Sequence, residues 1–183
     1  FYSKRPQVAV DEAFGRDEVI SRKELKPFVK RTDRHGLLHF AILMCGIVAT
    51  GALVHVTWGT FWVVPTMLLH SVVLATIYAP VHECSHGTPF RTRWINEGVY
   101  WFLSLLYFQP PYFYRYAHAT HHTYTGLVGK DSELVFAARP TVIGYLEVVS
   151  GLPFWQRNFR WFVRNALGRV HPAERHFLPE DEL

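Results

Sequence analysis

The longest uncharged run in the chain covers residues 35–82, which are 48 residues without Asp, Glu, Lys or Arg. Because a bilayer-spanning helix needs roughly 20 predominantly apolar residues, this run can hold two spans and a tight turn. The pattern predicts a first span over Leu37–Val56, a turn over residues 57–60 and a second span over Phe61–Val81. A hairpin buried inside a soluble protein is the alternative interpretation of the same pattern.

Two later apolar segments, the second with one charge at Glu147, are shorter and contain helix breakers. Residues 98–114 are uncharged for 17 residues, but Pro110 and Pro111 prevent the end of this segment from continuing as a helix. We expect a re-entrant or interfacial segment here, with a third span as the alternative. Residues 141–155 are largely apolar and are interrupted by glycine and proline, which also predicts an interfacial location.

A basic amphipathic helix is predicted after residue 155. Arg157, Arg160 and Arg164 follow an i, i+3, i+7 spacing, while Phe159 and Phe162 lie elsewhere on the helical wheel. Such a helix suits a membrane headgroup surface, with a solvated basic helix as the alternative. The predicted fold class is therefore all-α: an integral membrane protein with one transmembrane hairpin and interfacial helices that carry the histidine clusters described below.

The net charge of +4 comes from basic residues on both sides of the predicted hairpin. Arg91 and Arg93 follow the second span, the turn has no basic residue, and a basic group precedes the first span: Lys23, Lys26, Lys30, Arg31 and Arg34. Under the positive-inside rule both ends of the hairpin face the cytoplasm. We therefore attribute the charge to topology and lipid contact, not to nucleic-acid binding. The expected organisation is a charged cytoplasmic arm over residues 1–34 and a membrane domain over residues 35–183.

Five of the 11 histidines stand in two short clusters. The first cluster lies in HECSHG and the second in HATHH, and together they contain His82, His86, His118, His121 and His122. Both spacings place the rings on one face of a helix turn. Because neutral imidazole is the commonest protein ligand for transition metals, the clusters predict a metal centre at a membrane surface. Cys84 projects from the opposite face of its helix, so we do not count it as a ligand.

The arrangement of the five imidazoles favours two metal ions over one. On an ideal helix His118 and His122 lie about 40° apart, while His121 projects about 60° to the other side of His118. This arc of three imidazoles suits binding to two metal ions better than binding of all three nitrogens to one ion. With the pair from the first cluster, the five ligands exceed the three that are usual at a single catalytic zinc. Nitrogen ligands beside an apolar slot suit oxygen activation against a hydrocarbon chain.

Two rival interpretations start from the same residues. His82, Glu83 and His86 spell H-E-x-x-H, the zinc-protease motif in which two histidines bind zinc and the glutamate is the general base. An intramembrane zinc metalloprotease would leave HATHH unexplained, and no later Asp in an apolar segment completes its site. A haem carrier or metal-handling membrane protein is the other rival, although haem would need paired histidines on facing spans.

The string HECSHGTPFRTRWINE, followed by RYAHATHHTYTG and KDSEL, resembles the membrane fatty acid desaturase superfamily, particularly its bacterial-type members. The superfamily pattern is H-x3-4-H, then H-x2-3-HH, then a third H/Q-x2-HH box. The first two boxes are matched here, so the resemblance implies that the five clustered histidines are iron ligands. The similarity covers about residues 35–183.

The resemblance implies an oxygen-dependent di-iron oxidoreductase on a four-span helical scaffold, with two irons per enzyme and molecular oxygen as co-substrate. The implied reaction is desaturation of a lipid acyl chain, with fatty acid or alkane hydroxylation and carotenoid ketolation or hydroxylation as alternatives in the same superfamily. The implied partners are the bilayer, a lipid or acyl substrate, and an electron donor such as a ferredoxin or a cytochrome b5-type protein. The expected location is a bacterial inner membrane, with the histidine clusters on the cytoplasmic face.

The chain departs from the superfamily pattern in one respect, because neither a third box nor a second hairpin precedes Leu183. We therefore expect the front part of a longer protein, or a protein whose remaining ligands come from elsewhere. By itself such a chain is expected to hold iron weakly and to be inactive. Asp131 and Glu133 are open to two interpretations: support of ligating histidines by hydrogen bonds, or solvated loop acids, which is the commoner state of such residues.

Overall fold

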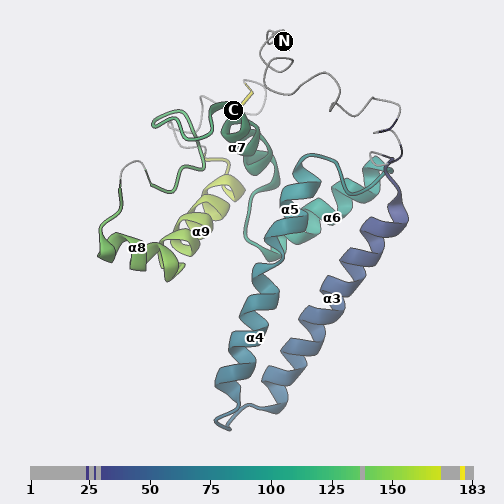
Figure 1. Cartoon of the computed structure of the whole chain (residues 1–183), viewed down its shortest axis with the longest axis vertical. Helices are drawn as coiled ribbons and strands as arrows, with labels where there is room; N and C mark the ends of the chain where they lie inside the picture. The colour runs from purple at the N-terminus through teal and green to yellow at the C-terminus, as the bar shows by residue number, and fades with distance from the viewer. Residues whose placement is uncertain (1–23, 25–26, 28–29, 137–138, 170–177, 180–183) are drawn as a thin grey trace. The chain divides into compact units, whose positions relative to one another are not determined.

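The computed structural model describes residues 24, 27, 30–136, 139–169 and 178–179, and every regular element among them is helical. The chain divides into two units, Phe1–Arg31 and Thr32–Leu183, which are considered separately. Most of the predicted arm lies outside the described residues. The second unit, whose helices are labelled in Figure 1, confirms the predicted all-α fold class.

Two long apolar helical segments form the hairpin that the uncharged run predicts. The first is α3 (Asp33–Val56), and the second consists of α4 (Val63–Ala75) and α5 (Tyr78–Ser85), which together make one candidate span over Val63–Ser85. Each is long and apolar enough to cross a membrane, and only 6% of the apolar stretch of each is buried. This exposure fits a membrane hairpin, whereas a soluble core hairpin would be buried. Each helix extends about one turn beyond its predicted bound, at the polar end of the hairpin.

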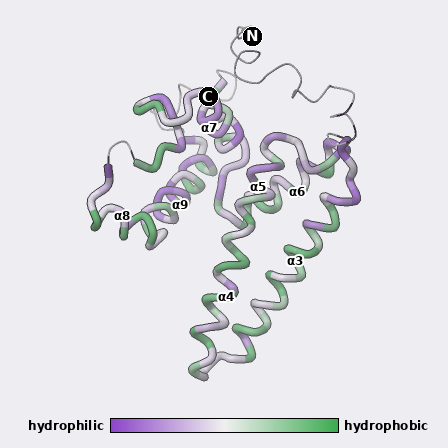
Figure 2. The backbone as a smooth tube through the Cα atoms, in the orientation of Figure 1, coloured by the Kyte–Doolittle hydropathy of each residue, from purple (hydrophilic) through white to green (hydrophobic). Residues whose placement is uncertain are grey.

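Hydroxyl side chains join α3 to α4. The Thr50 hydroxyl lies 2.8 Å from Nδ1 of His70, and the hydroxyls of Thr57 and Thr66 are also 2.8 Å apart. Hydrogen bonds of this kind are common between helices that pack within a membrane. Figure 2 shows hydrophobic residues along both helices, with hydrophilic residues gathered at the end of the hairpin away from its turn. The histidine clusters lie at this hydrophilic end.

A proline pair separates the next two helices, as the sequence predicts. α6 (Arg93–Leu106) ends before Phe108, which has a positive φ of 53°, and α7 (Pro111–Tyr124) starts on the second proline. A proline is tolerated there because the first helical N–H has no partner within the helix. The 14 residues of α6 are too few to cross a bilayer, and the described part of the chain contains no third candidate span.

The core of this unit lies where α5, α6 and α7 meet. Tyr100 of α6 and Val81 of α5 are fully buried in it. The Asn96 amide donates a hydrogen bond of 2.9 Å to the carbonyl of Cys84, which ties α6 to α5. The Tyr100 hydroxyl donates one of 2.6 Å to the carbonyl of Pro111, which ties α6 to α7. Through α6, the core therefore fixes the two histidine-bearing helices against each other.

The start of α3 is anchored beside this core. A Cβ atom on Gly36 would lie 2.6 Å from the carbonyl oxygen of Pro89 and 2.6 Å from Cε1 of Phe90, so only glycine allows this approach. At the beginning of the helix, the Asp33 carboxylate accepts hydrogen bonds from the backbone N–H and the hydroxyl of Thr92, at 2.8 and 2.7 Å. These contacts join the hairpin to the segment between α5 and α6.

The last two helices are α8 (Val142–Val149) and α9 (Leu152–Ala166). Between them Gly151 has a φ of 71°, a left-handed conformation that glycine adopts without strain. α9 confirms the helix predicted from the arginine spacing. One side of α9 packs on α7, where the Trp161 and Phe113 rings have centroids 4.7 Å apart, and its other side is exposed. α9 therefore covers part of α7, the helix that carries HATHH.

Candidate metal centre

α5 carries the first two predicted ligands at its end. His82 lies in the last turn of the helix and His86 is its capping residue, with ring centroids 5.0 Å apart. This separation is the one expected for side chains at i and i+4. Val81 and Cys84 of the same helix are 0% exposed in the core. Burial of that face leaves the histidine face directed toward α7.

α7 carries the second cluster on the side that packs into the protein. Its buried residues are Phe113, Tyr114, Ala117 and His118, which follow a helical spacing. His118 is 2% exposed, and its ring stacks on that of Tyr114 with centroids 5.2 Å apart and an interplanar angle of 16°. His122 follows one turn later on the same side, so both rings face α5.

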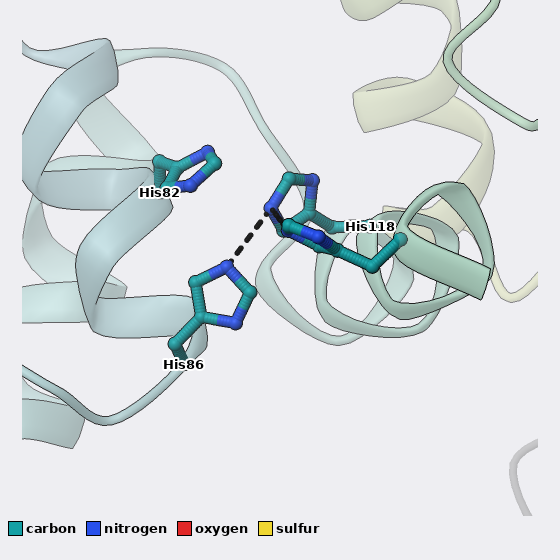
Figure 3. A group of neighbouring side chains, drawn as sticks. His82, His86 and His118 are labelled. Carbon is teal, nitrogen blue, oxygen red and sulfur yellow. Dashed lines mark hydrogen bonds between the residues drawn. The ribbon is translucent and has the colours of Figure 1, made fainter. Parts of the chain in front are cut away.

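Four of the five clustered histidines converge. Nε2 of His118 lies 3.0 Å from Nε2 of His86 and 3.0 Å from Nε2 of His122, and the ring centroids of His82 and His118 are 4.3 Å apart. One ligand atom from each of these four residues lies within 4.8 Å of the others. Figure 3 shows His82, His86 and His118 extending toward one another from two facing helices. We call these four residues the four-histidine group.

The spacing within the four-histidine group is compatible with metal binding. With metal–nitrogen bonds of about 2.0–2.1 Å, two nitrogens 3.0 Å apart can both contact one ion. Imidazole nitrogens bind iron, copper, zinc and nickel, so the donor set fits iron without selecting it.

His121 lies beside the four-histidine group and not within it. Its ring centroid is 5.9 Å from that of His118 and 5.8 Å from that of His122, and its Nδ1 lies 2.7 Å from a carboxylate oxygen of Asp131. On a helix this residue projects to the other side of His118, as the spacing predicts. The structure thus brings four predicted ligands together and gives the fifth a separate environment.

The interpretation of Asp131 and Glu133 as solvated loop acids is wrong. The Asp131 side chain is 1% exposed and contacts His121, while an oxygen of Glu133 lies 2.9 Å from Nδ1 of His118. Because a carboxylate accepts hydrogen bonds, each contact places an acceptor at Nδ1 of its imidazole. In the sequence, this arrangement is visible only as two acidic residues at positions i and i+2, in the segment that follows HATHH.

The electrostatic environment keeps His118 neutral. Burial lowers the pKa of His118 to about 3, and the nearby imidazoles of His82 and His122 act in the same direction, because a second positive charge there would be repelled. A neutral imidazole is the form that coordinates a metal. His118 is therefore in its ligating form throughout the physiological pH range.

The two acids differ in how firmly they hold their charge. Burial raises the pKa of Glu133, and the neighbouring histidines offset only part of this effect. Burial also acts to raise the pKa of Asp131, but hydrogen bonds from His121 and from the backbone N–H groups of Gly126 and Glu133 outweigh it and lower the pKa. Asp131 is therefore the more securely ionised of the two acceptors.

Glu83 lies on the α3 side of α5, away from the four-histidine group. Its carboxylate accepts a hydrogen bond of 2.7 Å from the Thr88 hydroxyl, and the residue lines a cavity of about 470 Å³ together with His35 and His39 of α3. A zinc protease would need this glutamate beside the metal-bound water. The placement of Glu83 argues against that use.

An aromatic cavity of about 310 Å³ adjoins the four-histidine group. One wall includes Tyr114, which stacks on His118, and Tyr78, whose ring contacts that of His82 with centroids 5.9 Å apart. The opposite wall belongs to α9 and includes Phe154. Local sequence patterns do not reveal these aromatic lining residues, because they come from helices that are far apart in the chain.

Comparison with known families adds an independent observation. The family model described as fatty acid desaturase matches residues 68–181, a range that includes both histidine clusters. No solved structure matches the chain.

The chain is also similar to curated desaturases and to related enzymes. It is 27% identical over 88 residues to a Delta(12) fatty acid desaturase of Mortierella isabellina, a match that covers 48% of this chain and 21% of the relative. It is 26% identical over 120 residues to a Delta(12)-acyl-lipid-desaturase of Punica granatum, covering 66% and 26%. It is 24% identical over 104 residues to the fatty acid conjugase FAC2 A of Calendula officinalis, covering 52% and 26%. The matches span about a quarter of the length of these relatives.

Proposed function

This chain belongs to the fatty acid desaturase family, and from this premise we propose that the protein is an oxygen-dependent, di-iron membrane oxidoreductase that desaturates a lipid acyl chain. The observation that carries the proposal is the convergence of four histidines from both clusters at the end of a candidate span. Iron would be held by the four-histidine group and by His121. When bound, it would supply the activation of molecular oxygen that C–H chemistry requires.

The residues around the four-histidine group have roles that suit this reaction. Glu133 places a carboxylate oxygen 2.9 Å from Nδ1 of His118, which is not the ring nitrogen that faces His86 and His122. The lining of the aromatic cavity is largely apolar, although it also includes Glu133 and Arg157, and its aromatic part suits a stretch of acyl chain. The four-histidine group borders this cavity through Tyr78 and Tyr114. A hydrocarbon in the cavity would therefore contact the tyrosine rings that pack against two of the metal ligands.

The same geometry disfavours the zinc-protease alternative. Glu83 is hydrogen-bonded to Thr88 on the α3 side of α5 and does not belong to the four-histidine group. In addition, a protease that used only His82 and His86 would leave the contacts of His118 and His122 with His86 without a role.

The exposed apolar hairpin associates the protein with a membrane. We further propose that both ends of the hairpin, and with them the metal centre, face the cytoplasm, because basic residues flank the hairpin and are missing from its turn. Electrons would come from a ferredoxin or a cytochrome b5-type protein. The relatives described above are fungal and plant proteins, so a bacterial inner membrane stays a prediction from the sequence.

The proposal is tested with membranes that contain the full-length enzyme, a reduced ferredoxin or cytochrome b5, and acyl lipids. Gas chromatography with mass spectrometry should detect a new double bond that forms only when oxygen is present. His118→Ala should abolish this product. His39→Ala is the matched control, because His39 lies on α3 outside the four-histidine group. An oxygen-independent product, or full activity in His118→Ala, would contradict the proposal.

A further inference from the structure

The loop after α7 folds back onto that helix. The Ser132 hydroxyl donates a hydrogen bond to the carbonyl of Ala117, the residue immediately before HATHH. The Asp131 carboxylate accepts hydrogen bonds from the backbone N–H groups of Gly126 and Glu133, at 2.8 and 2.9 Å. Because these bonds involve backbone atoms, they fix the loop conformation itself. Both acids are thus held in place alongside the helix that carries the second cluster.

Each acid contacts a different histidine of that cluster. Asp131 lies 2.7 Å from Nδ1 of His121, and Glu133 lies 2.9 Å from Nδ1 of His118. Only His118 belongs to the four-histidine group. One acid therefore acts on a ligand inside this group, and the other acts on a histidine beside it.

We propose that Asp131 and Glu133 are positioning residues that hold His121 and His118 as Nδ1–H tautomers, each with its Nε2 lone pair free for a metal ion. An imidazole without an acceptor at Nδ1 populates both tautomers, and only one of them leaves Nε2 free. A carboxylate hydrogen bond also raises the basicity of the ligating nitrogen. The inference rests on the proposed function for the identity of the metal, but the tautomers themselves belong to the metal-free protein.

A purely structural role for the acids makes a different prediction. If they only anchored the loop, their removal would lower thermal stability without changing the protonation of either imidazole. Glu97 is a suitable control for such a role, because its carboxylate binds Arg115 of the same α7 helix at 3.0 Å. The loss of Glu97 should disturb the anchoring of α7 while leaving the two histidine–carboxylate contacts intact.

The first measurement is nitrogen-15 NMR of histidine-labelled, metal-free full chain in lipid nanodiscs. We expect His118 and His121 to be Nδ1–H tautomers in the wild type. Glu133→Ala should produce a tautomer mixture at His118 alone. Asp131→Ala should produce one at His121 and, because the Asp131 carboxylate also holds the loop through Gly126 and Glu133, should weaken the Glu133–His118 contact as well. Glu133→Gln should retain the His118 tautomer because its amide oxygen still accepts, and Glu97→Ala should change neither ring. Unchanged tautomers in both acid-to-alanine variants would overturn the inference.

The second measurement is an anaerobic titration of the same proteins with Fe²⁺. Loss of a group that supports a ligand typically weakens metal binding by ~10- to 100-fold, so we expect a loss of this size in Glu133→Ala and a smaller one in Glu133→Gln. Equal Fe²⁺ affinity in the wild type and both alanine variants would overturn the inference. If His118 and His121 of the wild type are both Nδ1–H tautomers but the protein binds no Fe²⁺, the result would contradict the proposed function and still support the positioning role.

Discussion

Nε2 of His118 lies 3.0 Å from Nε2 of His86, although the two residues belong to different helices and are 32 positions apart. Two imidazole nitrogens at this distance need either a proton or a metal ion between them. Glu133 contacts the other nitrogen of His118, Nδ1. With the imidazole proton on Nδ1, as proposed above, Nε2 of His118 carries a lone pair and no proton. This contact between α5 and α7 joins the two histidine clusters into one group.

The approach of α3 to the core predicts a stability difference between two glycine variants. Gly36→Ala should lower the free energy of unfolding by about 1–3 kcal/mol, because its Cβ would overlap the Pro89 carbonyl and the Phe90 ring. Gly98→Ala is the matched control, since that position lies within helix α6 and its Cβ would meet nothing within 4 Å. Alanine there should stabilise α6 by about 0.5–1 kcal/mol. Thermal unfolding in detergent measures both, and equal midpoints would contradict the packing at Gly36.

Acid should destabilise the metal-free protein through His118. The folded-state pKa of about 3 lies below the ordinary value of 6.5, so between these pH values the unfolded chain binds a proton that the folded protein does not. Stability therefore falls as the pH drops below 6.5, by up to about 1.4 kcal/mol per pH unit, and is unaffected by this group above that pH. Thermal midpoints between pH 7 and pH 4.5 should show this slope, and His118→Gln should reduce it. An equal slope in both proteins would disagree with the burial of His118.

Much of this architecture could be predicted from the sequence. The uncharged run predicts the hairpin because a bilayer requires long apolar helices, and the proline pair at 110–111 predicts the break between α6 and α7. The periodicity of HECSHG and HATHH predicts which histidines share a face. It also predicts that His121 projects away from the side of α7 that carries His118 and His122.

Other features depend on contacts between distant segments, which local periodicity does not contain. The contact of Gly36 with Phe90 joins α3 to a loop more than fifty positions later. The roles of Asp131 and Glu133 depend on how their loop folds back onto α7, and composition alone favours solvated acids there. The aromatic cavity is built from α5, α7 and α9 together, and therefore emerges only when these helices pack.

The hairpin predicts the behaviour of the protein toward membranes. Expressed protein should sediment with membranes and resist extraction by alkaline carbonate, because the apolar surfaces of both candidate spans are exposed and need lipid around them. The measurement is an immunoblot of the pellet and the supernatant after carbonate treatment. Recovery in the supernatant without detergent would contradict two membrane spans.

Glu83 separates the two enzymatic interpretations of H-E-x-x-H. Glu83→Gln in a full-length, reducible enzyme should leave measurable oxygen-dependent conversion of an acyl lipid, because the carboxylate lies on the α3 side of α5 and contacts Thr88. His82→Ala should leave none. In a zinc protease the same glutamine variant would abolish turnover while sparing the metal. Oxygen-independent peptide cleavage that disappears in Glu83→Gln would therefore replace the desaturase assignment.

The central claim is that histidines from both clusters hold iron together, and the metal content of anaerobically purified protein tests it most directly. We predict that iron dominates over zinc in the wild type, that His86→Ala and His118→Ala each lose most of it, and that His39→Ala keeps it. The loss in both variants follows because the two Nε2 atoms are neighbours in the four-histidine group. Zinc as the main metal, bound undiminished in His118→Ala, would contradict the claim.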